Sequence, residues 1–435
     1  MGVFGALAKK VGTVKLFDGN IEMASLEELL DDIKTFAPDL LVVSTGFPSI
    51  EEDMRVAKAI KNFRPETKIL AFGVYFTLLD KKSIENYPFL DFAINGEPDE
   101  TFNELIQLMS QGHNDFSSIK GLYYSDDAGI HENEPRPLIE DIEKVPHPDR
   151  TLFKNDKYRL PHNNKTFTLI NSARGCPFPC IYCIVSPYYG SKVRKHSLQY
   201  IIDEVKECHN IYGIEEFLFW EEVFALDKQF VSDFCDELKK NNLNIKWAAT
   251  TRVDTLDEAT LRKMKDSGCY LLGLGIESGC QEILDNAKKK QTIEGIREAV
   301  ALCKKVKLQT MGHFIFGLPG ETKETAEKTI DFMVDLGIDF MQAYCAVPYP
   351  KTELGELAFK EGWVTETRWS KYDFGGDCII NNGSLTAQEV TAFREKAFRR
   401  FYFRPTFIVK KFFTNISIRQ IFQITKFVDW IKSGG

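Results

Sequence analysis

The first part of the chain alternates amphipathic helical patterns with short apolar runs. Residues 26–36 and 50–63 place apolar side chains at helical spacing, with acidic side chains on the opposite side of each helix. Residues 40–44 are continuously apolar, which predicts a strand buried on both faces. Residues 68–73 predict a second strand, and residues 92–97 a third that runs into a helix near Pro98. The alternation of strand and helix predicts a parallel α/β sheet.

A second α/β series begins at Thr166. Its apolar runs are separated by helical patterns, as at residues 198–212 and 322–336. The predicted strands are residues 167–171, 216–220, 246–250, 270–275, 311–316 and 340–346. Six strand–helix units predict a barrel or partial barrel, in which the loops at the carboxyl ends of the strands carry the chemistry.

The pattern predicts four regions. A Rossmann-like domain spans residues 1–112, and an ordered linker with a hairpin at residues 123–130 follows over residues 113–165. The partial barrel spans residues 166–350, and a helical, basic and aromatic region spans residues 351–435. The last region fits a helical cap on the barrel. Its basic and aromatic residues also fit an interfacial amphipathic helix in peripheral contact with a membrane.

Composition narrows the classes of protein. Hydrophobic residues make up 43% and charged residues 27% of the 435 positions, as in an ordinary soluble protein. The formal net charge of −8 argues against a nucleic-acid binder. No signal peptide or membrane-spanning apolar run is visible. Ten cysteines are too few for a disulfide scaffold of this length, so we expect a cytoplasmic protein.

Three of the cysteines form the most informative motif. Cys176, Cys180 and Cys183 follow a C-x3-C-x2-C spacing on a proline-rich stretch, which suits a soft metal centre. Three thiolates on a four-iron cluster leave one iron with an open coordination position. The alternatives are a zinc site with His196 as fourth ligand, or unliganded core thiols. Structural zinc usually pairs two C-x2-C knuckles, and only one is present here.

The cysteine motif, with Tyr182 directly before its last cysteine, resembles the signature of the radical S-adenosylmethionine (SAM) superfamily. The resemblance implies that the three thiolates hold a [4Fe-4S] cluster and that the methionine part of SAM chelates the fourth iron. A low-potential cluster in contact with a sulfonium can deliver one electron and break a C–S bond. The resemblance also implies a cofactor-binding role for Tyr182.

Other strand ends resemble the SAM contacts of this superfamily. Glu221 and Glu222 end the second barrel strand and resemble the acidic motif near the methionine amine. Arg252 ends the third strand and resembles the partner of the methionine carboxylate, which a guanidinium binds bidentately. Taken singly, charged residues at strand ends are usually solvated or salt-bridged. Their order behind the cysteine motif is what supports the assignment.

The last two strand-end segments fit the same series. Glu277 ends the fourth strand and resembles the acid that binds the ribose hydroxyls of SAM. The turn that contains Gly317 and Pro319 resembles the fifth-strand motif whose backbone lies against adenine. A turn of this composition before a helix also needs no ligand to explain it.

The N-terminal region resembles the cobalamin-binding-like domain of one radical SAM subfamily. That subfamily includes anaerobic magnesium-protoporphyrin monomethyl ester cyclases and cobalamin-dependent methylases. The Asp-x-His-x-x-Gly loop that supplies a cobalt ligand in other cobalamin proteins is absent, and no histidine precedes His113. Relatives begin with a strand, whereas this chain starts in an apparent helix at residues 5–10. We therefore expect a domain that lacks its first strand, with cobalamin as its cofactor.

These resemblances imply a radical SAM enzyme that acts on an unactivated carbon of a small molecule. Reductive cleavage of SAM by the cluster would give a 5′-deoxyadenosyl radical, with methyl transfer where cobalamin is bound. A flavodoxin or ferredoxin would supply the electron. The alternatives are an oxidative cyclase or rearrangement enzyme without cobalamin, and a binding or electron-transfer protein that holds iron–sulfur or zinc. A methylthiotransferase would need a further cysteine triplet, whereas the first cysteine here is Cys176.

Overall fold

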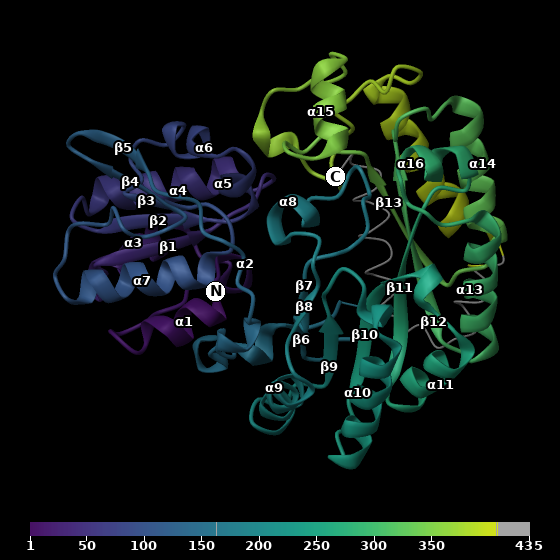
Figure 1. Cartoon of the computed structure of the whole chain (residues 1–435), viewed down its shortest axis with the longest axis horizontal. Helices are drawn as coiled ribbons and strands as arrows, with labels where there is room; N and C mark the ends of the chain where they lie inside the picture. Colours follow the sequence, from purple (N-terminus) through teal and green to yellow (C-terminus); the bar gives the residue numbers. More distant parts are fainter. Residues whose placement is uncertain (162, 406, 408–435) are drawn as a thin grey trace.

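Two sheets organise the molecule. The computed structural model describes residues 1–161, 163–405 and 407. Figure 1 shows the N-terminal sheet on one side and a larger, curved sheet on the other. The short helix α8 (Val185–Tyr189) lies between them. The predicted fold class, a Rossmann-like sheet beside a partial barrel with a helical C-terminal region, is confirmed.

The N-terminal sheet has the strand order β1-β2-β3-β4-β5. Its first three strands are parallel, and the hairpin β4–β5 extends the sheet because Tyr124 pairs antiparallel with Phe92. The hairpin predicted within the linker therefore makes this sheet mixed. Its strands are β1 (Leu40–Ser44), β2 (Lys68–Phe72), β3 (Phe92–Ile94), β4 (Leu122–Asp126) and β5 (Gly129–Glu132).

The prediction that residues 40–44 are buried on both faces is wrong. Four residues of β1 are half-buried, and Ser44 is exposed. The reason is its place in the sheet, because β1 is an edge strand that pairs with β2 alone among the described strands. By contrast, Ile69 to Phe72 in β2 are all buried, since β2 has a partner on each side.

Helices cover both faces of this sheet (Figure 1). Phe4 stacks on Phe102 and Phe72 with ring centroids 4.0 and 4.5 Å apart, which holds α1 and α7 on one face. Ser25 caps α3 through a capping box with Glu28, so this helix begins where the sequence predicted. The helices are α1 (Gly2–Ala8), α2 (Gly19–Glu22), α3 (Leu26–Phe36), α4 (Ile50–Phe63), α5 (Val74–Leu78), α6 (Lys81–Glu85) and α7 (Pro98–Ser110).

The second sheet is a parallel half-barrel with the strand order β13-β12-β11-β10-β9-β6. Each strand lies beside its neighbour in the chain, as expected for consecutive right-handed strand–helix units. A two-stranded hairpin, β7 (Ala173–Arg174) with β8 (Arg194–Lys195), follows the first strand. The barrel strands are β6 (Phe167–Ile170), β9 (Glu216–Phe219), β10 (Lys246–Arg252), β11 (Cys269–Glu277), β12 (Gln309–Phe316) and β13 (Phe340–Cys345).

Amphipathic helices cover the outside of the half-barrel. They are α9 (Leu198–Asn210), α10 (Lys228–Lys240), α11 (Glu258–Asp266), α12 (Gln281–Asn286), α13 (Ile293–Lys305) and α14 (Lys323–Asp335), followed by α15 (Glu353–Lys360) and α16 (Ala387–Tyr402). Short 3-10 helices span Ile142–Lys144, Arg150–Leu152, Asn155–Lys157, Phe224–Leu226, Val253–Thr255 and Trp369–Lys371.

The helix α16 caps the edge of the barrel. The Tyr402 hydroxyl donates to the Met341 carbonyl on β13 over 2.6 Å, and Arg400 pairs with Asp331 on α14. This agrees with the predicted helical cap. Most of the tail proposed for membrane contact, residues 408–435, lies outside the described residues. Within the described ranges, no helix combines the length and apolar character that crossing a membrane requires.

Candidate functional site

The cysteine segment is bracketed by the β7–β8 hairpin. Gly175 has a φ of +93°, and a Cβ there would lie 2.3 Å from the Lys192 carbonyl oxygen, so only glycine fits. The Cys176 N–H donates to the Gly190 carbonyl over 3.2 Å, which closes the segment into a compact loop. The sequence did not predict this hairpin, because each of its strands has only two residues.

The environment of the three thiols fits thiolate ligands of an iron centre. Cys176, Cys180 and Cys183 are all half-buried on the one loop. The N–H groups of Phe178 and Val185 donate to the sulfur atoms of Cys176 and Cys183, and such hydrogen bonds tune clusters. Burial raises the pKa of Cys176, and that of Cys183 to about 12. Bound iron would supply the positive charge that keeps these groups ionised.

The zinc alternative names His196 as a fourth ligand beside the three cysteines. Among the residues that the structure describes, no three His, Cys, Asp or Glu side chains gather as they would around a single ion. In a four-iron cluster each thiolate binds a different iron, so a wider spacing is expected. The His196 ring stacks on Tyr200 at 3.9 Å, and its Nδ1 lies 3.5 Å from a Glu143 oxygen. This histidine therefore packs its ring against Tyr200 of α9.

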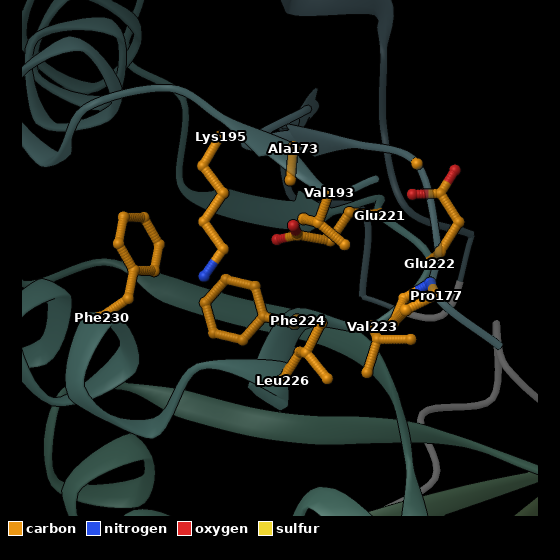
Figure 2. A pocket seen from close by; sticks show the side chains of 11 residues that line it. Ala173, Pro177, Val193, Lys195, Glu221, Glu222, Val223, Phe224, Leu226 and Phe230 are labelled. Carbon is orange, nitrogen blue, oxygen red and sulfur yellow. The ribbon is translucent and has the colours of Figure 1, made fainter. Parts of the chain in front are cut away.

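The two adjacent acids after β9 point in different directions (Figure 2). Glu221 is buried in a small pocket beside Phe224 and accepts a hydrogen bond from Ser172. Burial raises its pKa to about 7, although the Ser172 hydroxyl acts in the opposite direction. Glu222 is only half-buried, and after burial and Cys180 its charge contributes to the raised pKa of Cys176. Of the two acids, Glu222 is therefore the one whose charge acts on Cys176.

Arg252 lies directly against the cysteine loop. Its guanidinium stacks on the Phe178 ring at 3.7 Å, with Nη1 4.0 Å from the Cys180 sulfur. Two bonds of 2.9 and 2.7 Å tie it to the Asp254 carboxylate. These contacts leave Nη1 as the donor directed at the loop.

Glu277 forms a buried cluster with Lys289 and Tyr182. Its backbone has a φ of +68° and follows a register shift between β11 and β12, which turns its side chain out of the regular alternation. The Lys289 ammonium lies 2.6 Å from Glu277 and 3.4 Å from the Tyr182 hydroxyl. Burial raises the Tyr182 pKa well above its ordinary value. Since Tyr182 lies between two cysteines in the sequence, this cluster adjoins the loop.

The turn after β12 is held from within the fold. The Gly317 N–H donates to the Glu321 carboxylate over 2.5 Å, and burial raises the pKa of Glu321 to about 8. A Cβ on Gly317 would meet Val390 of α16 at 2.9 Å, so one side of this turn faces the capping helix. Pro319 lines a surface groove together with Ile181 of the cysteine loop. The contact with adenine stays a prediction.

Several site residues were missed from the sequence. Lys289 lies in a run of three lysines that reads as an exposed helix end, yet it is 5% exposed. His313 on β12 and Tyr344 on β13 lie 3.1 Å apart through Nδ1 and the hydroxyl, and burial lowers the His313 pKa. In the sequence, the one sign of this pair is the imidazole of His313 within an otherwise apolar strand.

Comparisons with known proteins agree with the geometry of this site. The sequence profile of the radical SAM superfamily matches residues 170–333. An uncharacterized methyltransferase of Pyrococcus horikoshii is 32% identical over 413 residues, which cover 95% of this chain and 89% of the relative. The chain belongs to the radical SAM superfamily. It is therefore an enzyme that uses a [4Fe-4S] cluster and SAM, as the sequence predicted.

Two further comparisons support this enzyme class and the fold. The anaerobic magnesium-protoporphyrin IX monomethyl ester cyclase of Rubrivivax gelatinosus is 26% identical, over 88% of the radical SAM enzyme described here and 69% of the cyclase. The radical SAM methyltransferase TsrM of Kitasatospora setae, solved with cobalamin and a [4Fe-4S] cluster, has a TM-score of 0.69 and 19% identity. The match covers 84% of this enzyme and 72% of TsrM, and at this identity it shows the fold alone.

Proposed function

We propose that this radical SAM enzyme is a cobalamin-dependent methyltransferase that acts on an unactivated carbon of a small molecule. One observation carries the proposal: the cysteine loop lies between the carboxyl ends of the parallel strands of both sheets. Helix α5, which follows β2 of the N-terminal sheet, contacts α8, which follows Cys183. The names of the relatives, which include methyltransferases and a cobalamin-bound structure, support the same function.

The proposed roles follow from the geometry of the loop. Cys176, Cys180 and Cys183 hold the cluster. Glu222 acts on Cys176 through its charge and would accept from the methionine amine, whereas Glu221 serves to position Ser172. Nη1 of Arg252 is directed at the loop and would donate to the methionine carboxylate.

The remaining proposed contacts lie around the adenosyl part of SAM. Glu277 would accept from the ribose hydroxyls, with Lys289 as its ion-pair partner. The Tyr182 hydroxyl orients that lysine, and the turn of Gly317 and Pro319 provides backbone for adenine. When bound, the cluster and SAM supply the electron and the adenosyl radical.

The carboxyl edge of the N-terminal sheet has room for a flat ring. Added Cβ atoms would meet nothing within 4 Å at Gly96, and nothing nearer than 3.9 Å at Gly46. The backbone is therefore open to close approach at the ends of β3 and β1. No imidazole precedes His113, so cobalamin would bind here without a histidine ligand from residues 1–112.

A radical oxidative cyclase is the second candidate. It is favoured by the similarity to the anaerobic cyclases of Rubrivivax gelatinosus and Cereibacter sphaeroides, at 26% and 27% identity. In either case a flavodoxin or ferredoxin would supply the electron, and a reducing cytoplasm would protect the cluster. The half-buried His313–Tyr344 pair supplies a polar feature inside the barrel for substrate binding.

Product analysis separates these functions. The reconstituted, reduced protein is incubated with SAM, with and without cobalamin, and the products are measured by mass spectrometry. 5′-Deoxyadenosine in both samples, joined by S-adenosylhomocysteine only with cobalamin, supports methyl transfer. 5′-Deoxyadenosine that does not respond to cobalamin favours the cyclase. Neither product, from protein that holds a cluster and SAM, would contradict both.

A further inference from the structure

The two strands that bracket the cysteine loop carry arginines directly opposite each other. Arg174 on β7 pairs in register with Arg194 on β8. Their side chains are 12% and 4% exposed. Like charges at directly opposed positions destabilise a strand pair, and burial strengthens the repulsion. This hairpin therefore needs carboxylates from outside itself.

Both carboxylates come from the N-terminal domain. Asp99 Oδ2 lies 2.7 Å from Nη1 of Arg174, and Glu97 Oε2 lies 2.7 Å from Nη1 of Arg194. The second Glu97 oxygen is 3.4 Å from Arg174, so Glu97 spans both arginines. Glu97 and Asp99 stand at the first turn of α7, directly after β3 and Gly96. The helix N-terminus favours negative charge at this position.

Arg194 also fixes the far end of the loop. Its Nη2 donates to the Tyr189 carbonyl over 2.8 Å, and its Nη1 donates to the Ile139 carbonyl over 2.6 Å. The Ile139 N–H in turn donates to Glu97 over 2.7 Å. Tyr189 ends α8, the helix that follows Cys183. A single buried cluster thus joins the β3–α7 turn to β7, which precedes the cysteines, and to α8 and β8, which follow them.

We propose that Glu97 and Asp99 are positioning residues that hold the cysteine loop in its SAM-binding arrangement from the N-terminal domain. The inference rests on the proposed function, because it takes this loop as the cluster and SAM site. It goes further by making the N-terminal domain a structural part of that site. It also links the Gly96 turn, where we place cobalamin, to the loop through adjoining residues.

The test uses full-length Glu97→Gln and Asp99→Asn, which keep side-chain shape and remove charge. Glu22→Gln is the matched control, because Glu22 forms an exposed 2.6 Å ion pair with Lys154 outside the cluster. Hydrogen exchange of residues 173–195 is measured in cluster-free protein. The electron paramagnetic resonance change on adding SAM is then measured in reconstituted, reduced protein.

Both variants are expected to exchange residues 173–195 at least tenfold faster than wild type. They should also need at least tenfold more SAM for the spectral change, while Glu22→Gln matches wild type on both. Exchange and SAM dependence within twofold of wild type in both variants would overturn the inference. Asp99→Asn leaves Arg174 its contact with Glu97, so it is the variant to use if Glu97→Gln does not fold. A wild-type protein without a SAM-dependent spectrum would refute the proposed function instead, and the exchange data would still test the positioning.

Discussion

The carboxyl ends of the parallel strands differ in chemistry between the two sheets. The barrel end carries buried charges with partners, such as Glu277 with Lys289 and Arg252 with Asp254. The N-terminal edge presents Gly46 and Gly96, with open space over the backbone, and its buried acids Glu97 and Asp99 pair with the arginines of the β7–β8 hairpin. The first environment suits a zwitterionic, polar ligand such as SAM, and the second is where we propose that a broad ring binds. The proposed ligands differ between the two sheets because different side chains end their strands.

The largest effect is expected at the cysteine loop. Alanine at Cys176, Cys180 or Cys183 removes one thiolate, so each variant should lose most of its bound iron. The rate of 5′-deoxyadenosine formation should fall at least about a thousandfold. Iron analysis and product mass spectrometry measure this. Cys208→Ala is the matched control, since Cys208 is a buried thiol on α9 and should retain both properties. Retained SAM cleavage in all three loop variants would contradict the assignment.

A second prediction tests the charge pair in the barrel. Glu277→Gln leaves the Lys289 cation buried without a carboxylate, so the free energy of unfolding should fall by about 3 kcal/mol. The double variant Glu277→Gln with Lys289→Met should recover most of this stability but still bind SAM weakly. Urea denaturation and a SAM titration measure the two effects. If the double variant bound SAM as wild type does, Glu277 would have no place in that site.

A third prediction concerns pH and Glu221, the buried acid that accepts from Ser172. The pKa of Glu221 is about 7 in the fold and about 4.5 when unfolded, so the folded state binds more protons between these values. Its contribution to stability is therefore full below about pH 4.5 and is lost as pH rises through 7, a change of about 3 kcal/mol. Glu221→Gln should remove that part of the pH dependence in urea denaturation of the cluster-free protein. An unchanged pH profile would show that Glu221 is ionised in the fold.

The smallest effect is expected where the barrel side touches the N-terminal domain. Lys351 has a φ of +61° and binds the Thr77 carbonyl and Asp80 at 2.7 and 2.6 Å. Lys351→Gly relieves backbone strain of about 1 kcal/mol and loses an exposed ion pair of about 0.5 kcal/mol. Lys290→Gly is the control, because Lys290 is exposed with a φ of +55°. In urea denaturation, Lys351→Gly should raise the free energy of unfolding by about 0.5 kcal/mol less than the control does. An equal increase would show that the Lys351 contact adds no stability.

Periodicity and motif spacing predicted the strands and helices well. Residues 26–36 and 50–63 were predicted as helices with the bounds that the structure shows, because capping and apolar spacing are local properties. The exposure of β1 could not be predicted, since it depends on which strands pair with it. Arg252 was singled out from the order of the motifs, and the structure places it beside the cysteine loop.

The charged clusters of the site were harder to predict. The pairing of Lys289 with Glu277 depends on a register shift in β11, which leaves no mark in the sequence. Arg174 and Glu97 are 77 residues apart and meet only because the two domains pack together. The different directions of the Glu221 and Glu222 side chains likewise depend on tertiary packing, which the sequence does not show.

Binding of cobalamin tests the central claim about the two sheet ends most directly. Reconstituted protein is dialysed anaerobically against hydroxocobalamin, with and without SAM, and bound cobalamin is measured by its absorbance. We expect about one cobalamin per chain, bound whether or not SAM is present, because the two proposed sites lie at the ends of different sheets. A protein that cleaves SAM yet retains no cobalamin would contradict the proposed cobalamin site and favour the cyclase.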